Sequence, residues 1–159
     1  MEGLEDARGR RNLLERIGAK IPGFKGYLER EMRREVDKMQ RDWLAAQLDR
    51  ARGGMQGRIR DWSRSGNLAN LDVAGSIDKL LDRLANRVRH ADYGYTGFFD
   101  AVKIYEDELD RLYAFDLALS DTVEGLARRV DILPGAASEP ELRSLLEAVE
   151  TADRQFDER

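Results

Sequence analysis

The sequence predicts an all-α fold, an elongated helical bundle of five to six helices with one long amphipathic helix of about 28 residues. Apolar residues recur at spacings of three and four in every long segment. No stretch alternates apolar and polar residues for long enough to indicate a strand. We therefore expect a single helical domain over residues 1–159, in which residues 1–21 form an amphipathic N-terminal arm.

The first predicted helix carries Leu13, Leu14 and Ile17 and ends before a Pro-Gly turn signal at residues 22–23. Its apolar residues, together with Ile21 and Phe24, suit either a membrane surface or the face of the long helix. We favour packing on the long helix because the apolar face of the arm is short.

The long helix is predicted over Lys25 to Arg52. Gly53 and Gly54 follow, and glycine commonly closes a helix in the left-handed conformation, so we expect the helix to stop there. A separate short helix is then expected over residues 55–65. The apolar stripe of the long helix comprises Leu28, Met32, Val36, Met39, Trp43 and Ala46, with Tyr27, Leu44 and Leu48 beside it.

Three further helices follow. A stripe from Val73 to Val88 predicts a helix that ends near residue 91, with Asp72 as its N-cap. The next begins near Phe98 and runs to about residue 118 or on to residue 130. A Leu-Pro-Gly stop begins a short linker over residues 133–138, and Ser138 with Glu141 has the capping-box spacing that starts the last helix.

Net charge divides the chain into two unlike parts. Residues 1–90 hold 20 Lys or Arg against 14 Asp or Glu, whereas residues 91–159 hold 7 against 17, so the whole chain carries −4. These two parts can neutralise each other within one fold or remain separate and attract charged partners. The sequence leaves both possibilities open.

The most conspicuous short segment is residues 89–100, which combines the single His with two carboxylates and two glycines. It could display His90, Asp92 and Asp100 to a ligand, with Tyr93 and Tyr95 as the walls of a site. We favour a tight interhelical turn, because glycine suits such a turn and Asp suits helix ends. As a small-ligand or metal-dependent enzyme site, this segment is our third functional hypothesis.

The sequence indicates no catalytic residue, no cofactor and no metal site. It has no Cys, no glycine-rich phosphate loop and too few His for a di-iron bundle. The acidic run over residues 106–110, continued by Asp116 and Asp121, is typical of a solvated helix face.

Arginine residues cluster around the glycine pair and could bind an anion such as nucleic acid. This candidate anion-binding set comprises Arg50, Arg52, Arg58, Arg60 and Arg64. Acidic residues interleave with basic ones, however, and the pI of about 5.2 is low for a nucleic-acid domain. Nucleic-acid or anionic-surface binding is therefore our second hypothesis.

Our leading hypothesis is a non-enzymatic interaction or assembly module that self-associates, or binds a protein partner, through the long helix. A helix of that length exceeds what a compact domain of this size can cover, so its exposed end needs another surface. We expect a cytoplasmic protein, because Cys is absent and the first twenty residues are too charged for a secretory signal. No segment has the apolar length of a membrane span, and we consider a membrane surface a poor partner.

Overall fold

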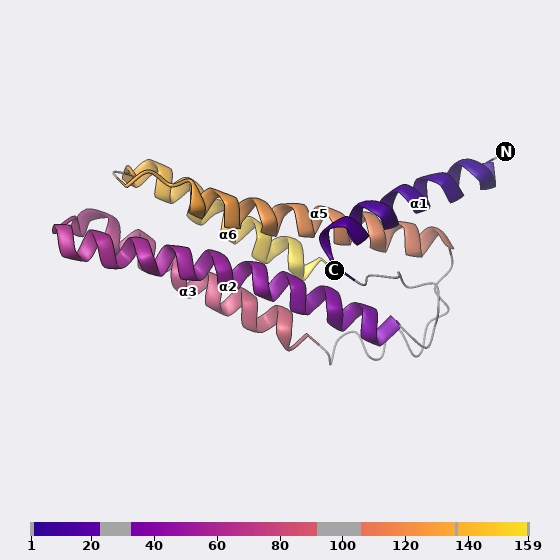
Figure 1. The fold of residues 1–159 in the computed structure, drawn as a ribbon, viewed down its shortest axis with the longest axis horizontal. Coiled ribbons are helices and arrows are strands. Elements are labelled where there is room, and N and C mark those ends of the chain that lie inside the picture. Colours follow the sequence, from indigo (N-terminus) through magenta and orange to yellow (C-terminus); the bar gives the residue numbers. More distant parts are fainter. Residues whose placement is uncertain (1, 23–32, 92–105, 136, 159) are drawn as a thin grey trace.

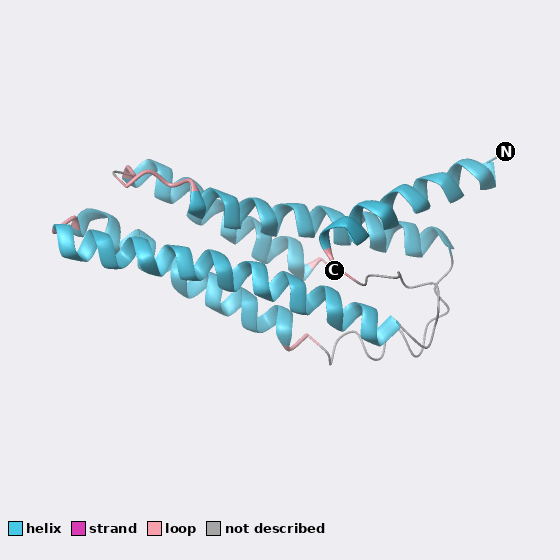
Figure 2. Cartoon of the chain, in the orientation of Figure 1, coloured by secondary structure: helices cyan, strands magenta, loops and turns pink. Residues whose placement is uncertain are grey.

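The fold was described from a computed structural model, which places residues 2–22, 33–91, 106–135 and 137–158. The described residues are helical apart from the turns, and they contain no strand (Figure 2). The predicted all-α, elongated bundle is therefore confirmed, with five α-helices in the described part of the chain. These are α1 (Glu2–Lys20), α2 (Arg33–Ser65), α3 (Leu71–Arg89), α5 (Glu106–Asp131) and α6 (Glu139–Asp157), with the short 3₁₀ helix η2 (Leu68–Asn70) before α3.

Two helical hairpins lie side by side in the bundle (Figure 1). Helices α2 and α3 form one hairpin, and α5 and α6 form the other. Helix α2 packs beside α5 and α3 packs beside α6, so the four helices surround one core. The turns of both hairpins lie at the same end of the molecule, which we call the turn end, and α1 packs on α5 toward the opposite end (Figure 1).

The turn end is held together by two side chains that reach from one hairpin to the other. The Trp62 indole Nε1 donates a hydrogen bond to the Gly135 carbonyl at 2.9 Å, and the buried Asn70 Nδ2 donates to the Ala137 carbonyl at 2.7 Å. The predicted N-cap role of Asp72 is wrong. Helix α3 begins two residues earlier than that cap requires, at Leu71, and Asn70 precedes it without a side-chain cap, since its amide binds the other turn.

Helix α2 runs without interruption through Gly53 and Gly54, so the predicted stop and the separate short helix were wrong. The reason is packing on both sides of the glycine pair, where Ala51 and Met55 are fully buried. Gly54 also lies close to α5, since a Cβ atom there would come within 2.8 Å of the Val130 Cγ1. Tertiary contact therefore outweighs the weak helix propensity of glycine. The predicted start of the long helix lies outside the described residues.

The buried face of α2 is rotated from the predicted stripe. It centres on Leu44 and Leu48, whereas Met39 and Trp43 are half-buried and Ala46 is exposed. Two polar side chains, Gln40 and Arg41, complete this buried face. A stripe drawn through apolar residues alone therefore missed it, because polar residues occupy part of the interior.

The last three helices agree well with their predicted apolar patterns. In α3, Val73, Ile77, Leu81, Leu84 and Val88 are buried. Helix α5 continues to Asp131, which agrees with the later of its two predicted ends. The predicted start of this helix, over residues 98–105, lies outside the described residues. The Ser138 capping box is present: the Ser138 Oγ accepts from the Glu141 N–H at 3.4 Å, and the Ser138 N–H donates to the Glu141 Oε2 at 3.1 Å.

Helix α1 packs on a second, smaller core. Ile17 and Ile21 are almost fully buried against Tyr113 and Leu117 of α5, and Trp43 of α2 lies at the edge of this cluster. The long helix was the predicted support for α1, whereas α5 supplies most of the contact. Among the described residues, no helix is long and apolar enough to cross a membrane.

Candidate functional site

The structure describes only the first three residues of the segment 89–100. His90 directly follows α3, is exposed, and donates its backbone N–H to the Asn86 carbonyl at 3.0 Å. The other four residues of this candidate surface, Asp92, Tyr93, Tyr95 and Asp100, lie outside the described residues. The ligand-site and turn interpretations of this segment therefore both stay predictions.

Three of the five arginines in the candidate anion-binding set are engaged within the chain. Arg52 bonds to Asp78 and Asp82 of α3 at 3.1 and 3.0 Å. Arg50 pairs with Asp131 at 2.6 Å, and Arg58 donates to the backbone carbonyl of the same residue at 3.4 Å.

The other two arginines of this set, Arg60 and Arg64, are exposed. Neither forms an ion pair with any residue that the structure describes. They are four positions apart and so share one face of α2. Anion binding by the five arginines stays a prediction, and these two are the members without an ion pair to the described residues.

The basic and acidic parts of the chain partly neutralise each other inside the fold. Lys20 pairs with Asp121 at 2.9 Å and with Glu124 at 2.8 Å, which ties α1 to α5. The hydrogen bond that Lys20 donates to Glu124 is the main reason that the pKa of Lys20 is raised above its ordinary value. On another side of the bundle, Arg83 and Arg87 of α3 both pair with Asp153 of α6.

Buried polar side chains on α2 and α5 also occupy the bundle interior, and sequence reasoning missed them. Arg41 is buried and donates through Nη1 to the Arg89 carbonyl at 2.9 Å, where a cation complements the C-terminal dipole of α3. Asp116 is fully buried, although the sequence placed it on a solvated face, and its backbone carbonyl accepts from the Ser120 Oγ at 2.7 Å. The helical spacing indicates this burial, because Asp116 lies three residues after the buried Tyr113 and so shares its face of α5.

The described residues contain no group of three or more His, Asp or Glu side chains arranged to hold a metal ion. The side chains of the acidic run at residues 106–110 lie outside the described part of the structure. The buried Arg41 is engaged in a structural contact with the Arg89 carbonyl.

An apolar groove follows α5 and α6 on the surface of the bundle near the turn end. It consists of two hollows that share Arg129 and Ile132. The first has a volume of about 430 Å³ and is lined by Leu133, Pro134, Pro140 and Leu145 among others. The second has a volume of about 680 Å³ and follows α5 past Leu126 and Gly125 to Ala148.

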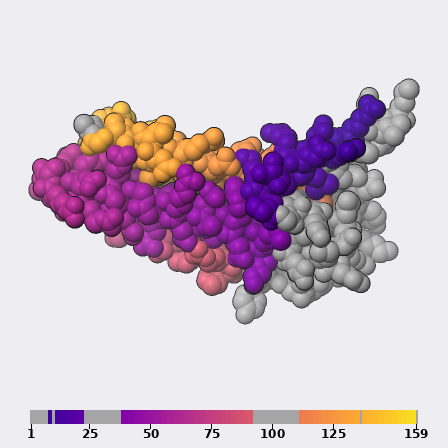
Figure 3. Space-filling model, in the orientation of Figure 1, coloured from indigo at the N-terminus to yellow at the C-terminus, as the bar shows by residue number. Residues whose placement is uncertain are grey.

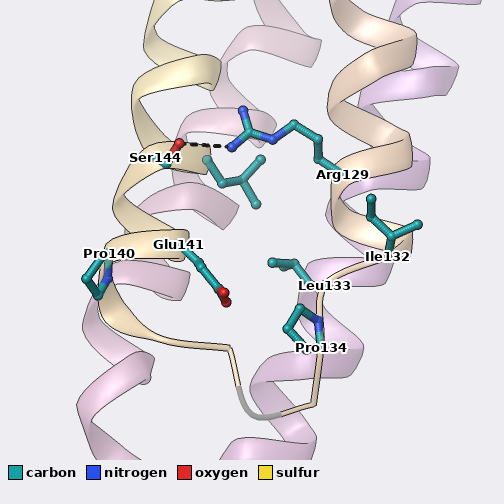
Figure 4. Close-up of a pocket in the computed structure, with 8 residues that line it drawn as sticks. Arg129, Ile132, Leu133, Pro134, Pro140, Glu141 and Ser144 are labelled. Carbon is teal, nitrogen blue, oxygen red and sulfur yellow. Dashed lines mark hydrogen bonds between the residues drawn. The ribbon is translucent and has the colours of Figure 1, made fainter.

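Ile132 is the prominent feature of this groove because it is 77% exposed. It lies just beyond the end of α5 and lines both hollows, of which Figure 4 shows the first. Arg129 reaches across from α5 and donates to the Ser144 Oγ of α6 at 3.1 Å. The groove thus combines one projecting apolar side chain with two recesses.

Sequence reasoning missed this groove. It treated residues 133–135 only as a helix stop, and the α6 side of the groove becomes visible only when α6 is placed beside α5. The one local signal was Ile132, a large apolar residue at the end of a helix. Two small residues, Gly125 and Ala148, line the groove, and a Cβ at Gly125 would contact nothing within 4 Å.

Comparison of the chain with protein-family models, with curated proteins and with solved structures gave no significant match. A functional proposal therefore has to come from the chemistry of the surface. The α5–α6 groove and the clefts beside it supply that chemistry.

Proposed function

We propose that the protein is a helical assembly module that pairs with a second copy of itself through the α5–α6 groove. The observation that carries this proposal is the position of Ile132 between two hollows of the same surface. A two-fold interface uses one patch on both subunits, so that patch must contain both the projection and the recess that receives it. The groove contains both.

The chemistry of the groove suits pairing with an identical surface. Its floor is mostly apolar, so covering it removes apolar area from water. Its rim carries charges of both signs, including Arg128, Arg129, Asp131 and Glu141. A rim of mixed sign can pair with a rotated copy of itself, whereas a rim of one sign would repel the copy.

This proposal moves the interaction surface away from the long helix. The apolar face of α2 packs against α3 and α5 within the chain, so the described part of α2 offers no apolar stripe to a partner. We give nucleic-acid binding by segment 50–64 less weight, because Arg50, Arg52 and Arg58 already bind groups within the chain.

The test is the mass of the full chain in solution, measured by light scattering over a concentration series at low and high salt. We expect a dimer that persists at high salt, since the contact is mainly apolar. Ile132→Glu places a charge in the centre of the contact and should weaken dimerisation by about tenfold or more. Circular dichroism should show an unchanged fold, because the side chain is exposed.

Leu68→Glu is the matched control. Leu68 is also a large apolar residue and is 70% exposed, the only one besides Ile132 among the residues whose side chains the structure describes, and it lines neither hollow. This variant should dimerise like the parent chain. A parent chain that stays monomeric at high concentration would overturn the proposal, and so would equal loss of dimer in both variants.

A further inference from the structure

A cleft opens where α1, α2 and α5 meet, beside the second hollow of the groove, with which it shares Asp121 and Arg128. Its volume is about 740 Å³. Four of the residues that line it are cations. Two come from the last part of α1, one from α2 and one from α5. The side chains that matter are Arg16, Lys20, Arg50 and Arg128, together with Trp43 and Gln47 of α2.

Two of these cations already have strong carboxylate partners. Lys20 pairs with Asp121 and Glu124, the two acidic residues that line the cleft, and Arg50 pairs with Asp131.

The remaining two guanidinium groups are available to a ligand. Arg16 forms no ion pair with the described residues. Arg128 is 66% exposed, and its contact to Glu124 is 4.0 Å long, which is a weak pair beside the 2.8 Å bond from Lys20 to the same carboxylate. The cleft therefore presents two incompletely neutralised guanidinium groups, from two different helices.

We propose that this cleft binds a small phosphate monoester that carries an aromatic ring. Guanidinium groups donate paired hydrogen bonds that match phosphate oxygens, so Arg16 and Arg128 would hold the phosphate from opposite helices. The half-buried Trp43 supplies an aromatic surface for the ring, and Gln47 supplies an amide for a polar edge of the ligand.

Binding in this cleft would also fasten α1 to the bundle. Helix α1 carries Arg16 and packs on the small core through only a few large side chains. A ligand that bonds to both α1 and α5 binds the docked arrangement and so stabilises it. Hydrogen exchange of the α1 amides should therefore slow when the ligand is present.

The experiment is a calorimetric titration of the full chain with adenosine monophosphate and, separately, with inorganic phosphate. We expect saturable binding of adenosine monophosphate, and weaker binding of phosphate because it lacks the ring. Arg16→Ala should weaken the nucleotide by about tenfold or more, since a charged hydrogen-bonding pair is lost. Equal affinity for both probes would overturn the aromatic part of the proposal.

Arg64→Ala is the matched control, because Arg64 is exposed on α2, forms no ion pair with the described residues and lies outside the cleft. It should bind like the parent chain. Ile132→Glu should keep saturable binding in the cleft, because Ile132 does not line the cleft, even though Arg128 lines both the cleft and the second hollow. Absence of saturable binding, or equal weakening by Arg16→Ala and Arg64→Ala in folded protein, would overturn the proposal.

Discussion

Gly53 and Gly54 are neighbours in α2 with opposite surroundings. A Cβ on Gly53 would meet nothing within 4 Å, whereas a Cβ on Gly54 would lie 2.8 Å from the Val130 Cγ1. Valine has a stiff side chain that cannot easily move aside. The first glycine therefore weakens the helix without any packing benefit, and the second lets α5 come close.

Alanine at these two positions should change stability in opposite directions. Gly53→Ala should raise the free energy of unfolding by about 0.5–1 kcal/mol, because alanine is the better helix former. Gly54→Ala should lower the free energy of unfolding, because overpacking against Val130 costs about 1–3 kcal/mol. The better helix propensity of alanine offsets part of that cost. Urea denaturation of both variants measures the difference. Equal stabilisation by both would show that α5 can yield at this contact.

Individual apolar residues were easier to predict than buried polar ones. The pattern of α3 identified its buried side chains because apolar residues there have few alternatives to the core. Gln40, Arg41 and Asp116 are buried in spite of their polarity. For Arg41 the desolvation is offset by a partner that only the folded chain supplies, the Arg89 carbonyl. A hydropathy pattern contains no record of such partners.

Helix α1 is attached to the bundle through its own small core. Its core around Ile17 and Ile21 is distinct from the main core of the bundle, and Lys20 adds two ion pairs to α5. A helix held in this way can loosen while the other four stay packed, since local opening follows local contacts.

Lys20→Met should loosen α1 and leave the bundle folded. Lys20 loses its bonds to Glu124 and Asp121, at a cost of about 1 kcal/mol for a part-buried pair. Limited proteolysis should then cut residues 2–20 faster, while the urea midpoint of the bundle changes little. A large fall in that midpoint would mean that α1 and the bundle unfold together.

The ion pairs of Lys20 also predict that the attachment of α1 depends on pH. The pKa of Lys20 is raised above 10.5 in the folded state, first by its bond to Glu124. Its contribution is therefore complete below the pKa of the unfolded chain and is lost as the pH rises through the higher folded value. In the parent chain, proteolysis of α1 should accelerate in that alkaline range, whereas in Lys20→Met it should not.

Helix boundaries were predictable where a local signal fixed them. The capping box at Ser138 uses two residues three positions apart, so the sequence alone locates the start of α6. The continuation of α2 through its glycines depends on side chains from α5, which are about 75 residues away in the sequence. The groove is similar, because one wall comes from each helix of the second hairpin.

In the molecule as a whole, ion pairs join the two hairpins in two places, between α3 and α6 and between α2 and α5. Asp153 of α6 binds Arg83 and Arg87 of α3, and only 13% of its side chain is exposed. Asp131 of α5 binds Arg50 of α2, and 44% of its side chain is exposed. The two carboxylates make similar connections in unequal surroundings.

Removal of these charges should therefore have unequal effects. Asp153→Asn should lower the free energy of unfolding by about 1–2 kcal/mol, because two arginines lose a shielded partner. Asp131→Asn should change it by about 0.5 kcal/mol or less, as is usual for an exposed pair. Asparagine keeps the size and nearly the helix propensity of aspartate, and urea denaturation compares the two. A larger loss from Asp131→Asn would contradict the role assigned to burial.

The pairing of two local hairpins bears on the order in which the chain folds. Within each hairpin, the helices are joined by a short segment, over residues 66–70 in one and 132–138 in the other. Contacts that are close in sequence form quickly, because little chain entropy is lost in closing the loop. Contacts between the hairpins, including the Trp62 bond to Gly135, close much longer loops. Docking of two preformed hairpins is therefore the step at which we expect the folding barrier to lie.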